Sequence, residues 1–160
     1  RDNIMNAVHI SDGKNIMLKS ISKWKHPFEV EMATFLCSPP LGDDPRNHFI
    51  PRLDVLQDPV DTDKEILVTP LLMDFDLPIV DTGGEGVACF HQIFEGIQFM
   101  HENFVAHRNC RRLNVVLDPS ELYPYGTHPG NPSANLANDG LACSPGGSNP
   151  PSGTTLANFW

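Results

Sequence analysis

A long amphipathic segment, followed by a charged loop and a short apolar run, is the feature that most restricts how this chain can fold. Residues 81–105 carry apolar side chains every three to four positions, which predicts a helix that is apolar over much of its circumference. The predicted stripe contains Val87, Phe90, Phe94, Ile97 and Met100 or His101, widened by Ile93 and Phe99. Residues 114–120, NVVLDPS, predict a short strand. Because so apolar a helix needs a covering layer, we expect this stripe to lie in the core.

Upstream of this helix, the sequence predicts a small sheet and one further helix. In residues 7–21, two apolar runs flank an Asp-Gly turn, which is typical of a β-hairpin. The segment from Pro27 to Cys37 begins at a proline and carries Phe28, Met32 and Leu36 three to four residues apart, which predicts a helix. Two strands are predicted at 50–58 and 64–72, and a surface loop at 38–49. The fold class indicated is α+β.

The C-terminal segment, residues 121–160, differs from the rest in composition. It has almost no charge and is rich in Gly, Pro, Ser and Asn. Segments of this kind bury too little apolar surface to offset the entropy lost on ordering. We therefore expect residues 121–160 to be a disordered tail, and the ordered part of the chain to span about residues 5–120.

Charge and cysteine usage restrict the partners and the compartment. The net charge is -9, which argues against a nucleic-acid partner, because polyanions are bound by clustered Lys and Arg. No apolar run reaches the roughly 18 to 20 residues that a membrane span requires, so no membrane partner is expected. The four cysteines are widely separated and include no CxxC pair, which favours a reducing, cytoplasmic (intracellular) location.

Two chemistries that the side chains could suggest are disfavoured. His91, His101 and His107 lie in one region, but their spacing and surroundings match no familiar zinc ligand set. A nucleophile built on Cys110 and His107 lacks a neighbouring group that would orient the base.

The loop after the long helix carries a recognisable order of residues. His107-Arg108-Asn109, four further residues, Asn114 and the run NVVLD follow the helix directly. This order resembles the catalytic loop of protein kinases, H-R-D-x-x-x-x-N followed by a strand. The resemblance covers about residues 7–120 and implies a protein-kinase-like α+β fold. It would comprise a sheet-rich small lobe at about 5–68, a hinge at about 69–76 and the start of the helical large lobe at about 77–120.

The resemblance implies nucleotide-contacting positions in the first half of the chain. Lys19 is similar to the strand 3 lysine that contacts the α- and β-phosphates of ATP. Glu29 fits the ion-pairing glutamate of helix C better than Glu31, because Met32 and Leu36 then follow it by three and seven residues on the apolar face. Thr69 occupies the gatekeeper place, and Leu71 lies in the segment that would line the adenine slot. Taken without this context, Lys19 and Glu29 could equally be ordinary surface residues.

In the loop itself, the resemblance implies roles for three residues. Asn109 stands where the catalytic aspartate accepts the substrate proton, and an amide cannot act as that base. Arg111 takes the place of a loop lysine that faces the γ-phosphate, and Asn114 matches a residue that ligates magnesium. Asn also suits turns and caps in general, so these positions have a purely structural interpretation as well.

The departures from the family pattern indicate impaired catalysis. No G-x-G-x-x-G precedes Lys19, and no D-F-G or A-P-E follows the loop. ATP and magnesium would therefore be bound weakly, and whether the chain is an enzyme stays open. Three hypotheses follow: a catalytically impaired kinase-like domain, an active Ser/Thr-type kinase known here as an incomplete chain, and a non-enzymatic interaction module. The third would use the helix at 86–104 for a protein partner or for self-association.

Overall fold

The computed structural model describes residues 3–74, 83–118, 127–128, 131–135 and 158–159. The described residues form a mixed α/β structure with a small antiparallel sheet, which agrees with the predicted class at that level. The chain divides into two compact units, Arg1–Leu71 and Leu72–Trp160. The boundary falls inside the segment 69–76, of which residues 75–76 lie outside the described part. The assignment of that segment as a hinge stays a prediction.

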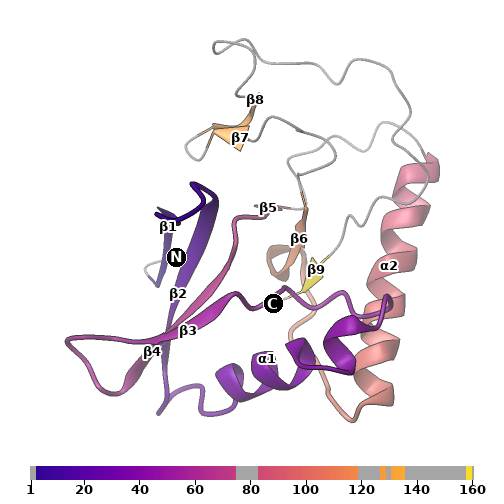
Figure 1. Ribbon diagram of the computed structural model, residues 1–160. Coiled ribbons are helices and arrows are strands. Elements are labelled where there is room, and N and C mark those ends of the chain that lie inside the picture. The colour runs from indigo at the N-terminus through magenta and orange to yellow at the C-terminus, as the bar shows by residue number, and fades with distance from the viewer. Residues whose placement is uncertain (1–2, 75–82, 119–126, 129–130, 136–157, 160) are drawn as a thin grey trace. The chain divides into compact units, whose positions relative to one another are not determined.

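The first unit is built on a four-stranded antiparallel sheet in the order β1-β2-β4-β3 (Figure 1). Its strands are β1 (Ile4–Val8), β2 (Asn15–Ser22), β3 (Asp54–Gln57) and β4 (Lys64–Pro70). The predicted hairpin is confirmed, because β1 and β2 pair antiparallel around a turn in which Gly13 has a φ of 69°. Only glycine adopts that conformation readily, so the Asp-Gly pair sets the register of the hairpin.

Helix α1 (Glu29–Cys37) starts two residues later than predicted and is linked to β2 by an ion pair between Glu29 and Lys19. Its buried residues are Ala33 and Leu36. Phe28 precedes the first turn and is 68% exposed, so its predicted place on the apolar side of the helix is wrong. The helix ends where Ser38 Oγ donates to the carbonyl of Thr34, just before two prolines that cannot continue it.

The segment between α1 and β3 is tied back onto the helix. It contains the 3₁₀ turn η1 (Leu41–Asp43), and Asn47 Nδ2 donates to the carbonyl oxygens of Leu36 at 2.7 Å and Leu41 at 2.9 Å. Cys37 Sγ donates to the Ile50 carbonyl at 3.4 Å and accepts the Arg52 N–H at 3.3 Å. The predicted surface loop therefore also contributes to the interior of the unit. The buried residues described in this unit are Ile16, Met17, Ile21, Ala33, Leu36, His48, Ile50, Leu67, Val68 and Thr69.

In the second unit, helix α2 (Gly83–Glu102) confirms the long helix, of which residues 81–82 lie outside the described part. It ends as Val105 N–H donates to the Met100 carbonyl at 2.8 Å, with Phe104 in the left-handed region at a φ of 60°. The predicted strand is confirmed as β6 (Val115–Leu117), which is fully buried and follows the 3₁₀ turn η2 (Arg112–Asn114). A three-stranded sheet orders β5 (Met73–Asp74), β6 and β9 (Asn158–Phe159).

The predicted apolar stripe of α2 is buried only in part. Val87, Phe90 and Phe94 are exposed, Phe94 by 67%, although the sequence placed them in the core. Ile93, Phe99 and Met100 of the predicted stripe are buried, and Cys89 and Gly96, which the prediction did not include, are buried with them. Because the helix is apolar on both sides, periodicity alone could not choose between them. Small residues at 89 and 96 allow a close approach on the side that is buried.

Short strands within residues 121–160 are a difference from the expected disordered tail. The strands β7 (Thr127–His128) and β8 (Asn131–Asn135) pair with each other, and β9 pairs with β6. The remaining residues of this segment lie outside the described part, where disorder stays a prediction. Within the described residues, no helix combines the length and hydropathy that a membrane span would need.

Candidate functional site

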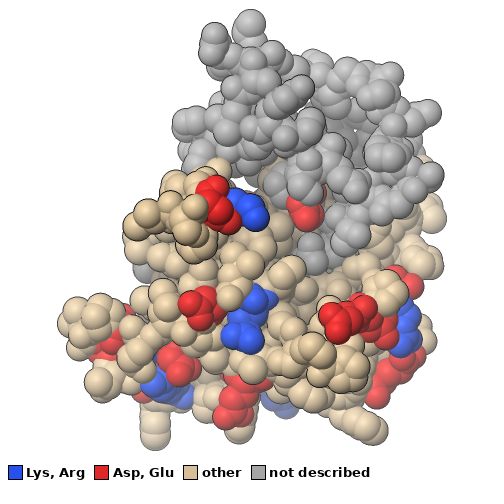
Figure 2. All heavy atoms as spheres, in the orientation of Figure 1, with Lys and Arg blue, Asp and Glu red and all other residues tan. Residues whose placement is uncertain are grey.

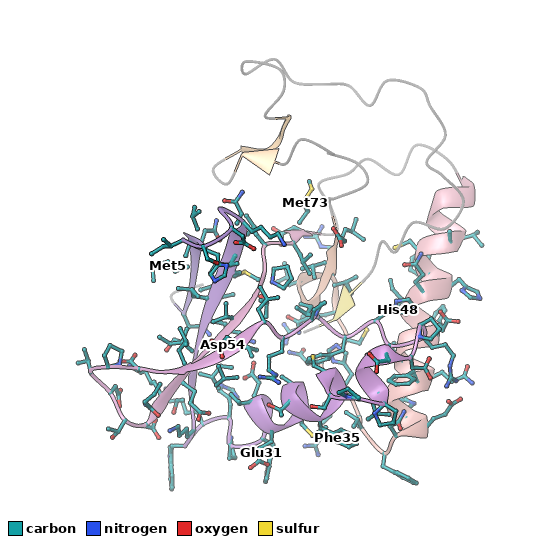
Figure 3. All side chains as sticks on the ribbon, viewed as in Figure 1. Met5, Glu31, Phe35, His48, Asp54 and Met73 are labelled. Carbon is teal, nitrogen blue, oxygen red and sulfur yellow. The ribbon has the colours of Figure 1, made fainter. Side chains whose placement is uncertain are left out.

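The side chains of Lys19 and Glu29 form an ion pair between strand and helix in the first unit. Lys19 Nζ lies 2.5 Å from Glu29 Oε1. The two side chains are 18% and 29% exposed, so water reaches the pair only in part. Glu31 is exposed, and Figure 3 shows it on the side of α1 that faces away from the sheet. The structure therefore pairs Lys19 with the glutamate that the sequence favoured.

The position of Lys19 follows from the alternation of β2. Met17 and Ile21 lie two residues away on either side and are buried, so all three side chains share one face of the sheet. Leu67 lies directly opposite Lys19 on β4 and is also buried. An ammonium group on an apolar face needs a counter-charge, and Glu29, at the start of α1, supplies it. Packing of α1 onto the sheet thus fixes the charge in place.

Thr69 lies on the same face as Lys19, on the neighbouring strand. It pairs in register with Met17 and is 1% exposed. Within the described residues its Oγ1 is buried and makes no hydrogen bond. A buried hydroxyl without a partner is unfavourable for stability, so this atom is a donor and acceptor that the fold of the first unit does not use. Leu71 follows directly after β4, and its N–H donates to the Asn15 carbonyl at 3.3 Å.

The loop of the second unit brings Asn109, Arg111 and Asn114 together. Arg111 Nε donates to Asn109 Oδ1 at 2.7 Å, and Asn114 Nδ2 donates to the Asn109 carbonyl at 2.9 Å. The Asn109 N–H donates to the His107 carbonyl at 2.8 Å, next to Arg108 with a φ of 60°. Both neighbours thus restrain residue 109. Its side chain is an exposed neutral amide, which can orient a ligand but cannot take up a proton.

The sequence did not indicate the bond between Arg111 and Asn109. It assigned Arg111 a contact with an external phosphate, whereas the structure shows that its Nε is used within the loop. A spacing of two residues in an irregular loop carries no periodic signal, so the sequence pattern could not indicate the contact.

Asn114 offers a metal ion only a single neutral oxygen. Asn114 uses its Nδ2 within the loop, which leaves its Oδ1 as one neutral oxygen ligand. Magnesium is usually held by one or two carboxylates together with phosphates. In the described residues, no group of three or more His, Cys, Asp or Glu side chains could hold a metal ion. Asn114 alone would therefore bind magnesium weakly.

Charged side chains on the visible surface are mixed in sign. Figure 2 shows Lys and Arg side chains beside Asp and Glu over the described part of this face. Many of the cations are in ion pairs, such as Lys23 with Glu65 at 3.6 Å and Lys64 with Asp61 at 3.0 Å. Such exposed pairs contribute little to stability. The exclusion of a nucleic-acid partner stays a prediction from net charge.

No protein-family model matches this chain, and no curated protein matches it. The kinase resemblance therefore rests on the residues themselves and on the contacts described above.

Proposed function

We propose that residues 7–120 are a protein-kinase-like domain that binds a nucleotide weakly through Lys19 and has lost most of its phosphotransfer activity. The observation that carries the proposal is the ion pair between Lys19 and Glu29. An ordinary surface lysine at a strand end would be solvated, whereas this one is largely shielded and held by a carboxylate from a different element. A fixed, partly desolvated cation is suited to bind phosphate oxygens.

Impaired catalysis follows from the chemistry at residue 109. The bonds from Arg111 and Asn114 hold the loop around Asn109, but the amide offers no basic group. Loss of a positioned general base typically lowers the rate by about two to four orders of magnitude. Phosphoryl transfer also depends on metal electrostatics, and Asn114 is a weak magnesium ligand by itself. We therefore expect phosphotransfer close to background.

The decisive experiment is a thermal melt with and without ATP, in magnesium and in EDTA. A site filled to about a hundred times its dissociation constant adds roughly 2.7 kcal/mol to the free energy of unfolding. We expect a stabilising shift in the native chain that disappears in Lys19→Ala. The matched control is Lys23→Ala, because Lys23 follows the same strand and also contacts a glutamate, Glu65. Equal shifts in both variants, or no shift in the native chain, would contradict nucleotide binding at Lys19.

A second candidate function is supported by the exposed side of α2. Val87, Phe90 and Phe94 are exposed together, and the rings of Phe90 and Phe94 stack with centroids 6.5 Å apart. A cluster of this kind is typical of a protein-interaction surface. The module would act without ATP. Hydrogen exchange of α2 amides that slows on adding a protein partner, and that Phe90→Ser with Phe94→Ser abolishes, would favour this candidate over nucleotide binding.

We also propose a reducing, intracellular location. Cys37, Cys89 and Cys110 are free thiols, which supports that location. Mass spectrometry of the protein isolated under thiol-blocking conditions tests it, since disulfides in that material would contradict it.

A further inference from the structure

The two edges of the first sheet differ in how well they are protected against pairing with another strand. At one edge, β3 carries the charged Asp54, is preceded by Pro51, and is followed by Asp58 and Pro59. Charges and prolines of this kind discourage edge-to-edge pairing. At the other edge, β1 reads IMNAV and contains neither a charge nor a proline. Among the residues that the structure describes, the edge of β1 is therefore the less protected one.

The hydrogen-bond register shows which backbone groups of β1 face outward. The N–H of His9 donates to the Lys14 carbonyl, and the Asn3 carbonyl accepts the N–H of Ser20, both at 2.8 Å. In an antiparallel pair every second residue is bonded to the neighbouring strand. Met5 and Ala7 are thus bonded to β2, whereas the backbone groups of the intervening residues point to the open edge. These residues are Ile4, Asn6 and Val8.

The side chains of β1 are complementary to a second copy of the same strand. If two β1 strands pair antiparallel about Asn6, Ile4 lies opposite Val8 and Met5 lies opposite Ala7. Apolar residues then face apolar residues on both sides of the joined sheet, and the two Asn6 amides face each other. Beyond the strand, Asn3 lies opposite His9, so the polar residues also match. A shift of one residue would move every side chain to the other face and lose these pairs.

Burial also favours this pairing. Met5 is 64% exposed although it belongs to a strand, and Val8 is exposed as well. A second β1 would place an apolar side chain beside each of them and would give about six interstrand hydrogen bonds. The absence of charge on β1 also avoids repulsion at the contact between two acidic chains.

We propose that β1 is a self-association edge, through which two copies of this chain pair antiparallel about Asn6 and join their four-stranded sheets into one. The partner is a second copy because the strand is complementary to itself in register, in polarity and in charge. This inference does not depend on nucleotide binding or on the exposed side of α2.

Analytical ultracentrifugation of the full chain over a range of concentrations tests the proposal. We expect a dimer that dissociates on dilution, and a monomer for Asn6→Pro. The Asn6 N–H points outward, so proline removes a bond between copies and none within the chain, and edge strands tolerate proline at such positions. A native chain that is monomeric at about 100 μM, well above the μM range of specific complexes, would overturn the proposal. A dimer that persists in a folded Asn6→Pro would do the same.

A matched pair of variants keeps the test decisive if Asn6→Pro fails to fold. Met5→Lys and Leu56→Lys each replace an exposed apolar residue at opposite edges of the sheet, and the register places both on the same face. We expect Met5→Lys to weaken the dimer at least tenfold and Leu56→Lys to leave it unchanged. Equal effects of the two substitutions, or a dimer lost only in Phe90→Ser with Phe94→Ser, would assign the contact to another surface.

Amide hydrogen exchange tests the register directly. At high concentration the amides of Ile4, Asn6 and Val8 should become protected, because they face the second copy. The amides of Met5 and Ala7 should be protected equally at all concentrations, because β2 already bonds them. Protection that does not alternate along β1 would contradict the antiparallel pairing.

Discussion

The candidate residues of the first unit and those of the loop in the second unit are held in different ways. Lys19 lies on an apolar sheet face and is paired with a carboxylate from α1, so its charge is fixed by tertiary packing. Asn109 lies in an exposed loop and is held by hydrogen bonds to residues two and five positions away. The first arrangement depends on the unit being folded, whereas the second is a local conformation. The charge at residue 19 thus depends on the fold of the first unit, whereas the geometry at residue 109 depends on neighbouring residues of the loop.

The largest expected change in the free energy of unfolding distinguishes the packed core of the first unit from the exposed side of α2. Leu36 is 1% exposed between α1 and the sheet, so Leu36→Ala should lower the free energy of unfolding of the first unit by about 2–5 kcal/mol. Phe94→Ala removes a larger but exposed side chain and should change stability by less than about 0.5 kcal/mol. Urea denaturation measures both. If Phe94→Ala cost as much as Leu36→Ala, the exposed side of α2 would have to be covered in solution.

A smaller change in the free energy of unfolding is expected when the polar contacts of Lys19 and of Arg111 are removed. Lys19→Ala leaves Glu29 partly buried without its counter-charge, and should cost about 1–3 kcal/mol, between the values for surface and buried pairs. Arg111→Ala removes an exposed hydrogen bond and should cost about 0–1 kcal/mol. Chemical denaturation at neutral pH measures the two losses. Adding Glu29→Gln to Lys19→Ala should recover part of the first loss. No recovery would mean that the pair does not interact as described.

The smallest effect concerns a contact of the first unit that lies entirely at the surface. The backbone N–H of Lys14 and, after it, the His9 ring keep the pKa of the Asp12 carboxyl below its ordinary value of 3.8. Because the pKa is lower in the folded state, Asp12 stabilises the hairpin above about pH 3.8. That contribution is lost as the pH falls through the folded pKa.

Asp12→Asn should therefore melt at a lower temperature than the native chain at pH 6 and at nearly the same temperature at about pH 2, in line with this linkage. A difference between the two proteins that stays constant across this range would contradict the role of the carboxylate. The hairpin amides, followed by NMR, report the same change locally.

Local sequence signals predicted much of the first unit. The Asp-Gly turn predicted the hairpin. The resemblance to protein kinases implied a glutamate partner for Lys19, and the spacing of the apolar residues of α1 favoured Glu29 over Glu31 for that role. Turn residues and the spacing of apolar residues are local patterns, which can be seen in a single sequence. The exposure of Phe28 was missed because a proline at 27 suggested an earlier helix start.

The second unit was harder to predict, because tertiary contacts decide which of its residues are buried and which of its strands pair. Helix α2 is apolar on both sides, so the choice between the side with Cys89 and the side with Phe94 depends on what packs against it. Strand β9 lies far along the chain from its partner β6, and its Asn158 is not typical of strands. The bond between Arg111 and Asn109 lies in an irregular loop, next to a left-handed backbone at Arg108 that arginine seldom adopts.

The hydrogen bonds at Cys37 have a practical consequence. Burial raises the pKa of this thiol, and its sulfur is bound by backbone groups of Ile50 and Arg52, so opening of the first unit should speed its reaction with a thiol-modifying reagent. Cys110 is exposed in the loop of the second unit and reacts without such opening. The rates at which one reagent labels these two residues in the same sample would report separately how often the first unit opens and how accessible the loop is.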